Sequence, residues 1–256
     1  YRVNTSTGER KLMMKDEPAA SFGTSPDAKY FLYWKDNQFQ AYDLDAMTTK
    51  TLTKSVPVSF VNTEYDYPLP KPPYGVTGFT SDNKSVILQG KYDQWVVALD
   101  GTTPPRNLTS GVGTKNETRF GYIRTDSAPA GGGGRGGRGG GGGRVSIDLS
   151  KPVLFSAYGQ WTKKAGFYEL RDGQLKEIVY DDASYAVPTK AAKADKFLFT
   201  RQTFAEFPDL RVSDGVAFGA AKKITDANPQ QSEYLWGRRI LFDYKNKKGV
   251  RLQGTL

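Results

Sequence analysis

Short runs of apolar and aromatic residues, separated by polar turns, recur along the chain. The clearest example combines a turn at residues 25–27, an aromatic run at residues 30–34 and an alternating segment at residues 38–44. Such alternation, bounded by Pro, Gly, Asn or Asp, is typical of β-strands. No long stretch has the 3.6-residue spacing of an amphipathic helix. The pattern therefore predicts an all-β protein.

This strand-and-turn unit occurs four times, with starts at residues 25, 81, 150 and 194. Repeats of this length are typical of propeller blades, because one four-stranded blade cannot bury both faces and must stack on its neighbours. We therefore expect a β-propeller of about four blades or blade parts. A β-sandwich with coincidental turn spacing is the alternative. Residues 1–11 predict two more strands, joined by a turn at Thr7-Gly8.

Histidine and cysteine are both absent from the 256 residues. Without histidine, the sequence lacks the usual general base, the usual zinc ligand and one member of a Ser-His-Asp triad. The lack of cysteine excludes disulfides and thiolate chemistry. The Gly-x-Ser-x-Gly motif of a nucleophile elbow is missing as well. We assign no catalytic residue, no metal site and no cofactor to this sequence.

The net charge of +9 is concentrated in two segments. Residues 131–144 contain three arginines and no acid, and residues 236–256 have a net charge of +5, which leaves +1 for the rest. The Gly/Arg tract resembles RNA-binding segments but lacks the aromatic residues that stack on bases. We expect a disordered surface insertion and no nucleic-acid binding. The chain also has no run of about 20 apolar residues, so we expect no membrane span.

Three other features have both a functional and a structural interpretation. Aromatic and proline residues in the segment 65–74, and Trp161, could line a substrate passage, but we favour ordered connections on a blade edge. The pairs Asp181–Asp182 and Asp43–Asp45 could bind a metal, but acids at strand ends usually form turns. Basic and apolar residues alternate over residues 238–251, which predicts a half-exposed hairpin with its turn near residues 246–249.

Several short motifs follow one another in a particular order. They are Thr7-Gly8-Glu9-Arg10, Ser25-Pro26-Asp27, Tyr92-Asp93-Gln94-Trp95, Asn107-Leu108-Thr109, residues 148–168, Asn228-Pro229-Gln230, Trp236-Gly237 and residues 240–256. In this order they resemble the propeller portion of bacterial prolyl-oligopeptidase-family (S9) serine peptidases. The resemblance covers nearly the whole chain apart from the Gly/Arg tract.

The resemblance implies that residues 1–235 form a propeller fragment, with residues 131–144 as an insertion. Residues 236–256 would be a linker and the first strands of an α/β-hydrolase domain that the sequence does not include. In that family the propeller limits which peptides reach the serine, aspartate and histidine of the hydrolase domain. The resemblance thus implies a substrate-gating role, with the hydrolase domain and a peptide as partners, in the bacterial periplasm or outside the cell. A non-catalytic propeller scaffold for protein interactions is the alternative.

Overall fold

The computed structural model describes residues 1–15, 18–125 and 145–256, so the Gly/Arg insertion expected at residues 131–144 lies outside the described part. The chain forms two compact units. The first consists chiefly of Tyr1–Lys115, and the second chiefly of Leu154–Glu169 and Lys176–Leu256. Each unit is built from β-sheets whose strands pair antiparallel, apart from one parallel pair in the first unit, which confirms the predicted all-β class.

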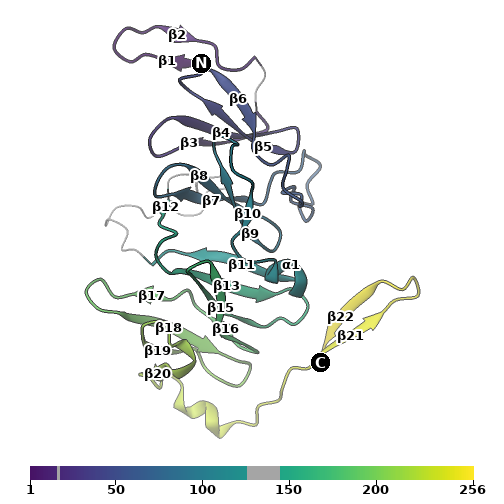
Figure 1. Cartoon of the computed structure of the whole chain (residues 1–256). Helices are drawn as coiled ribbons and strands as arrows, with labels where there is room; N and C mark the ends of the chain where they lie inside the picture. The colour runs from purple at the N-terminus through teal and green to yellow at the C-terminus, as the bar shows by residue number, and fades with distance from the viewer. Residues whose placement is uncertain (16–17, 126–144) are drawn as a thin grey trace. The chain divides into compact units, whose positions relative to one another are not determined.

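The first unit contains two larger sheets and a short hairpin (Figure 1). One sheet has the order β3-β4-β5-β6, and the other has the order β10-β9-β8-β7-β12, in which β12 joins β7 in parallel. The predicted strands near the beginning of the chain pair as β1 and β2. The bounds are β1 (Arg2–Val3), β2 (Arg10–Lys11), β3 (Ala20–Thr24), β4 (Tyr30–Lys35), β5 (Gln38–Asp43), β6 (Thr48–Thr51), β7 (Gly75–Thr80), β8 (Ser85–Gln89), β9 (Gln94–Ala98), β10 (Arg106–Asn107) and β12 (Ser146–Ile147).

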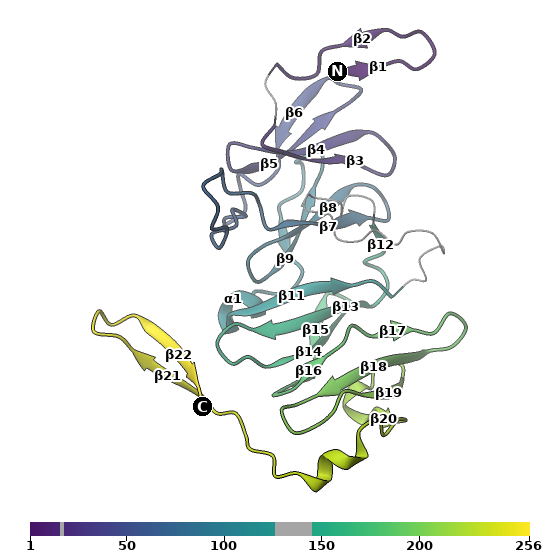
Figure 2. The ribbon, with the colours of Figure 1, turned by 180° about the vertical axis from the view of Figure 1, so that it is seen from behind.

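The second unit has a sheet of order β11-β13-β14-β15 and another of order β16-β18-β19-β20, with β17 also paired to β18. A two-stranded hairpin, β21–β22, follows them in the chain (Figure 2). The bounds are β11 (Thr118–Ile123), β13 (Val153–Gly159), β14 (Ala165–Arg171), β15 (Gln174–Asp181), β16 (Ser184–Tyr185), β17 (Thr189–Lys190), β18 (Lys196–Gln202), β19 (Asp209–Asp214), β20 (Lys222–Lys223), β21 (Leu241–Lys245) and β22 (Arg251–Thr255).

Helices in the described residues are short: α1 (Val112–Asn116), η1 (Phe218–Ala220) and η2 (Pro229–Glu233). None of them is long and apolar enough to cross a membrane. The sequence pattern did not predict α1. Its amides at Gly113 and Thr114 donate to the buried carboxyl group of Asp93, 3.0 Å away in both cases. A contact between residues this far apart in the chain leaves no local periodicity.

Each predicted repeat begins with a turn between two strands: β3 and β4, β7 and β8, β12 and β13, and β17 and β18. In the first, second and fourth repeats these two strands pair with each other, whereas β12 pairs with β7 of the preceding sheet. In the first repeat the Ser25 hydroxyl donates to Asp27 at 2.6 Å and accepts from the Tyr30 amide at 3.0 Å. In the second, the Thr80 hydroxyl donates to Asp82 at 2.6 Å and accepts from the Ser85 amide at 3.0 Å. These side chains replace missing backbone partners and fix the turn.

A threonine that follows the last strand closes three of the four sheets in the same way. Its hydroxyl accepts the backbone amide of a residue at the start of the third strand and donates to the side chain of the preceding residue. The sets are Thr53 with Phe39 and Gln38 (3.1 and 2.6 Å), Thr109 with Gln94 and Asp93 (3.2 and 2.6 Å), and Thr225 with Leu210 and Asp209 (2.9 and 2.7 Å). We call this arrangement the threonine clasp.

Apolar side chains bury the sheet faces within each unit. In the first unit Phe39 is fully buried, and its ring lies 5.0 Å from that of Trp34 and 5.7 Å from that of Phe60. In the second unit Phe218 lies 5.1 Å from both Phe167 and Phe199. Antiparallel four-stranded sheets that are covered by apolar faces are characteristic of propeller blades. The structure therefore has the fold class that the repeats predicted.

The clasp makes Thr109→Val a test of sheet closure. Thr109 is fully buried, so the substitution retains the shape of the side chain but leaves Asp93 and the Gln94 amide each without one partner. We expect the free energy of unfolding to fall by about 1–3 kcal/mol in urea titrations. Thr48→Val is the control, because Thr48 is exposed in β6. Equal midpoints for the two variants would contradict the role of the clasp.

The clasp in the last sheet should also depend on pH. Asp209 accepts from Lys223 at 2.8 Å, from Thr225 and from the Ala227 amide, which together lower its pKa from 3.8 to about 2. Its contribution to stability is therefore complete above about pH 4 and is lost as the pH falls through about 2. We expect the difference in urea midpoint between wild type and Asp209→Asn to shrink over this interval. For the control Thr48→Val, which removes no ionisable group, that difference should stay constant.

Candidate functional site

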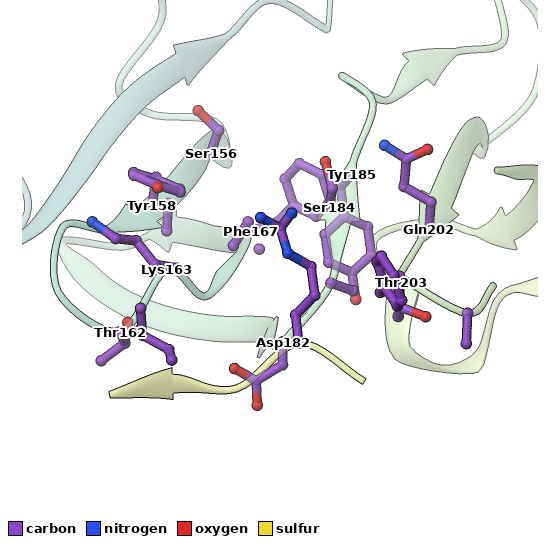
Figure 3. A pocket seen from close by; sticks show the side chains of 18 of the residues that line it. Ser156, Tyr158, Thr162, Lys163, Phe167, Asp182, Ser184, Tyr185, Gln202 and Thr203 are labelled. Carbon is purple, nitrogen blue, oxygen red and sulfur yellow. The ribbon is translucent and has the colours of Figure 1, made fainter. Parts of the chain in front are cut away.

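The second unit contains an open pocket of about 1020 Å³. Four separate parts of the chain line it: β13 with the turn to β14, the residues around β16, the loop from β18 to β19, and the segment before β21. Figure 3 shows Tyr158 and Lys163 on one side of the pocket and Gln202 and Thr203 on the other. All of the lining residues belong to the second unit.

An aromatic cluster forms the inner wall of the pocket. Phe167 from β14 is buried, and its ring makes edge contacts with Tyr185 at 5.3 Å and with Phe218 at 5.1 Å. These rings also contact Phe199 from β18. The wall is thus part of the apolar core, so its position follows from the packing of the sheets.

Two glycines permit the close approach of strands beside the pocket. A Cβ atom on Gly166 would lie 1.8 Å from the backbone oxygen of Val179, and one on Gly159 would lie 2.1 Å from the Thr162 hydroxyl. Any larger residue at these positions would push β14 away from β15 or open the β13–β14 turn. The width of the pocket at this end therefore depends on residues without a side chain.

An ion-pair network supports the residues beside β16. Arg201 contacts Asp181 at 3.2 Å and also pairs with Glu206, which in turn pairs with Arg211. The hydroxyl of Tyr185 donates to Asp181 at 2.9 Å. Burial raises the pKa of Tyr185 above its ordinary value, so this phenol is protonated at neutral pH. The network fixes Tyr185 as one wall of the pocket.

The mouth of the pocket has a positive charge. Lys163, Arg238 and Arg239 line it together with a single acid, Asp182. Within residues 1–15, 18–125 and 145–256, no group of three or more His, Cys, Asp or Glu residues lies close enough together to hold a metal ion. The lining thus combines cationic, hydroxyl, amide and aromatic groups with one carboxylate, and such groups bind and orient a ligand.

The aromatic loop at residues 65–74 belongs to the first unit and lies outside this pocket. Its base is tied down, because the Tyr74 amide donates to the Phe60 carbonyl at 2.9 Å and Val61 forms a bridge with Pro73. The rings of Tyr65 and Tyr67 lie 5.2 Å apart. The loop is thus an ordered connection, as we favoured from the sequence, with Tyr67 exposed at its tip.

The two acidic pairs considered in the sequence, Asp43–Asp45 and Asp181–Asp182, have different surroundings. Asp43 accepts the amides of Asp45 and Ala46, both at 2.9 Å, and so forms a turn as expected. Asp181 is held by Arg201, whereas its neighbour Asp182 is exposed and lines the pocket.

The hairpin expected near residues 238–251 is present as β21–β22. Gly249 donates to Asn246 at 2.9 Å across the predicted turn. Alternation predicted a half-exposed hairpin, but every residue of β21 is exposed. The expectation of one covered face was wrong for this strand, whereas Leu252, Gln253 and Gly254 of β22 are partly buried, and Arg251 and Gln253 contact Trp161.

Sequence reasoning did not find the pocket. Its basic residues come from segments about 75 residues apart in the chain, at Lys163 and at Arg238–Arg239. The two arginines stood out in the sequence only as part of a basic segment, which is more often a solvated strand face. Nothing local in the sequence indicates that the two segments meet.

Comparison with solved structures shows similarity to the propeller portions of S9 peptidases and to TolB. A putative dipeptidyl aminopeptidase IV from Bacteroides ovatus matches with a TM-score of 0.55 at 13% identity, over 98% of this chain and 36% of that chain. A puromycin hydrolase gives 0.46 at 14% identity, over 90% and 32% of the two chains. A putative TolB from Agrobacterium tumefaciens gives 0.34 at 15% identity, over 80% and 79%.

No protein-family model matches the sequence, and no curated protein matches it. The chain spans about a third of the Bacteroides ovatus protein, or 36% of its length. At these identities the similarity establishes the fold alone. The chain has the β-propeller blade architecture that is found in that protein.

Proposed function

We propose that this chain is the substrate-gating propeller portion of a serine peptidase that hydrolyses peptides. The observation that carries the proposal is the match to the putative dipeptidyl aminopeptidase IV, which covers 98% of this chain but 36% of that protein. The ordered sequence motifs point to the same family of peptidases. In this proposal residues 1–235 are the propeller part, and residues 236–256 lead into an α/β-hydrolase domain.

The catalytic groups would belong to that hydrolase domain, since this sequence contains no histidine. A serine there would attack the peptide carbonyl, with a histidine as base and an oxyanion hole for the tetrahedral intermediate. The propeller would contribute by restricting access to these groups. Its blades supply a rigid wall, because each sheet is closed by side-chain hydrogen bonds and buried on its apolar faces.

The exposure of the β21–β22 hairpin is consistent with a neighbouring domain that covers it. Phe242 and Tyr244 on β21 are 41% and 47% exposed, and Val250 in the hairpin turn region is 52% exposed. An isolated two-stranded hairpin is marginally stable in water, and exposed apolar side chains add to that cost. In the proposed peptidase these side chains would be covered by the hydrolase domain.

A contact region at Trp161 joins the hairpin to the β11-β13-β14-β15 sheet. The Arg251 guanidinium lies 4.1 Å from the ring centroid of Trp161, in the β13–β14 turn, and also pairs with Asp243 at 2.6 Å. Gln253 donates to the Trp161 carbonyl at 2.6 Å. This contact region, which we call the Trp161 latch, would set the direction in which the chain enters the next domain.

The proposed function is tested on the native protein. Antibodies raised against this chain would isolate it from its source cells, and a fluorophosphonate probe would then label reactive serines. We expect a labelled polypeptide heavier than 28.3 kDa that hydrolyses short peptide nitroanilides. A captured protein without labelling and without hydrolysis would contradict the peptidase and favour the scaffold for protein interactions.

The latch is tested by Trp161→Ala. Loss of a cation–π contact worth about 0.5–2 kcal/mol should free the hairpin more often, so we expect trypsin to cleave between residues 238 and 251 roughly 2- to 30-fold faster. Tyr67→Ala is the control, because Tyr67 is an exposed aromatic residue outside the hairpin and its contact region. Cleavage at the wild-type rate in Trp161→Ala would show that the latch does not hold the hairpin.

A further inference from the structure

We infer that the pocket of the second unit binds the carboxylate of a short peptide, with Arg238 and Arg239 as the groups that recognise it. The peptide nature of the ligand rests on the proposed function, whereas the preference for a carboxylate rests on the geometry of the pocket.

The two arginines are available for a ligand. Neither forms a hydrogen bond or an ion pair with any residue of the described part of the chain, although both line the pocket. Arg201 and Arg211, by contrast, are already paired with Glu206. A guanidinium group presents its N–H donors in a planar fork that matches a carboxylate, so Arg238 and Arg239 are suited to a bidentate contact.

The charge around these arginines favours an anion further. Lys163 also lines the pocket, and its ammonium group donates to the Gln160 carbonyl, which leaves two of its three N–H groups for a ligand. Asp182 is the one acidic residue in the lining, so the pocket has a net charge of +2. An anionic group entering the mouth would be attracted to it.

Aromatic rings beside the arginines favour a peptide over a small inorganic anion. Tyr158 is 45% exposed and Phe204 is 51% exposed, and both line the pocket. The Phe204 ring is held by an edge contact with Trp236 at 6.0 Å. The apolar side chain next to a peptide carboxylate could lie against these rings. A volume of about 1020 Å³ is enough for a few residues.

The carboxylate could be the free end of the peptide or an acidic side chain, and three probes distinguish them. All carry an N-terminal fluorophore: Ala-Ala-Phe with a free carboxyl group, Ala-Ala-Phe amide, and Ala-Glu-Phe amide. Fluorescence anisotropy with the 256-residue chain gives the dissociation constants. The variants are Arg238→Gln/Arg239→Gln and the control Lys247→Gln/Lys248→Gln, which removes the same charge from the β21–β22 turn.

We expect the chain to bind at least one carboxylate probe about 10-fold more tightly than Ala-Ala-Phe amide. This preference should disappear in Arg238→Gln/Arg239→Gln and persist in the lysine control. Tight free-acid binding identifies the peptide end, and tight Ala-Glu-Phe amide binding identifies a side chain. Urea midpoints equal to wild type would show that both variants are folded, as expected for exposed residues.

Three outcomes would overturn the inference: equal binding of all probes, no binding of any probe, or equal loss of the preference in the two variants. The assay measures binding by this chain without catalysis. A failure here would therefore leave a positive serine-labelling result intact, and a failure of serine labelling would leave a measured carboxylate preference intact.

Discussion

Two of the sheets end in a very short outer strand, and their apolar faces stay covered only if side chains hold that strand in place. β10 and β20 each contain two residues, so they form few backbone hydrogen bonds with their neighbours. A threonine two residues after the outer strand compensates, because its hydroxyl accepts a backbone amide at the beginning of the previous strand. Because the hydroxyl both accepts and donates, it satisfies a buried amide and a buried side chain at once. Without this closure, the apolar faces that pack inside each unit would lose their outer boundary.

The β11-β13-β14-β15 sheet has no threonine clasp, and the pocket lies beside this sheet. β15 contains eight residues, and Asp182-Ala183 follows it where the other sheets have Leu-Thr or Ile-Thr. The Tyr180 hydroxyl is within 3.1 Å of the Thr162 hydroxyl and within 3.3 Å of the Thr118 hydroxyl. This strand ends at Asp181, which is held by Arg201, and so delivers Asp182 to the pocket. The sheet without the clasp is thus also the one after which an acidic side chain, Asp182, is exposed in the pocket.

Much of the fold could be predicted because its signals are local. The Asp172-Gly173 dipeptide has positive φ at both residues, as a tight hairpin requires, and it joins β14 to β15. Contacts between distant segments could not be predicted. β12 joins the edge of β7, and a Cβ atom on Gly78 would lie 2.5 Å from the Val145 oxygen. Gly78 indicates a close backbone approach in hindsight, but nothing in its sequence neighbourhood names the partner.

The clasp in the last sheet also has a mechanical consequence. Thr225 lies between β20 and η2, in the segment that leads to the hairpin, and its hydroxyl donates to Asp209 at the start of β19. Tension applied to the hairpin would first meet the Trp161 contact, then the contacts of Trp236 with Phe204 and of Gln231 with Ala205. It would next load the bonds of Asp209 to Ala227 and Thr225 before it reached the β19–β20 pairing. The Asp209 side chain therefore bears load before the backbone hydrogen bonds of the sheet do, which protects the β20 edge of the sheet from being pulled apart.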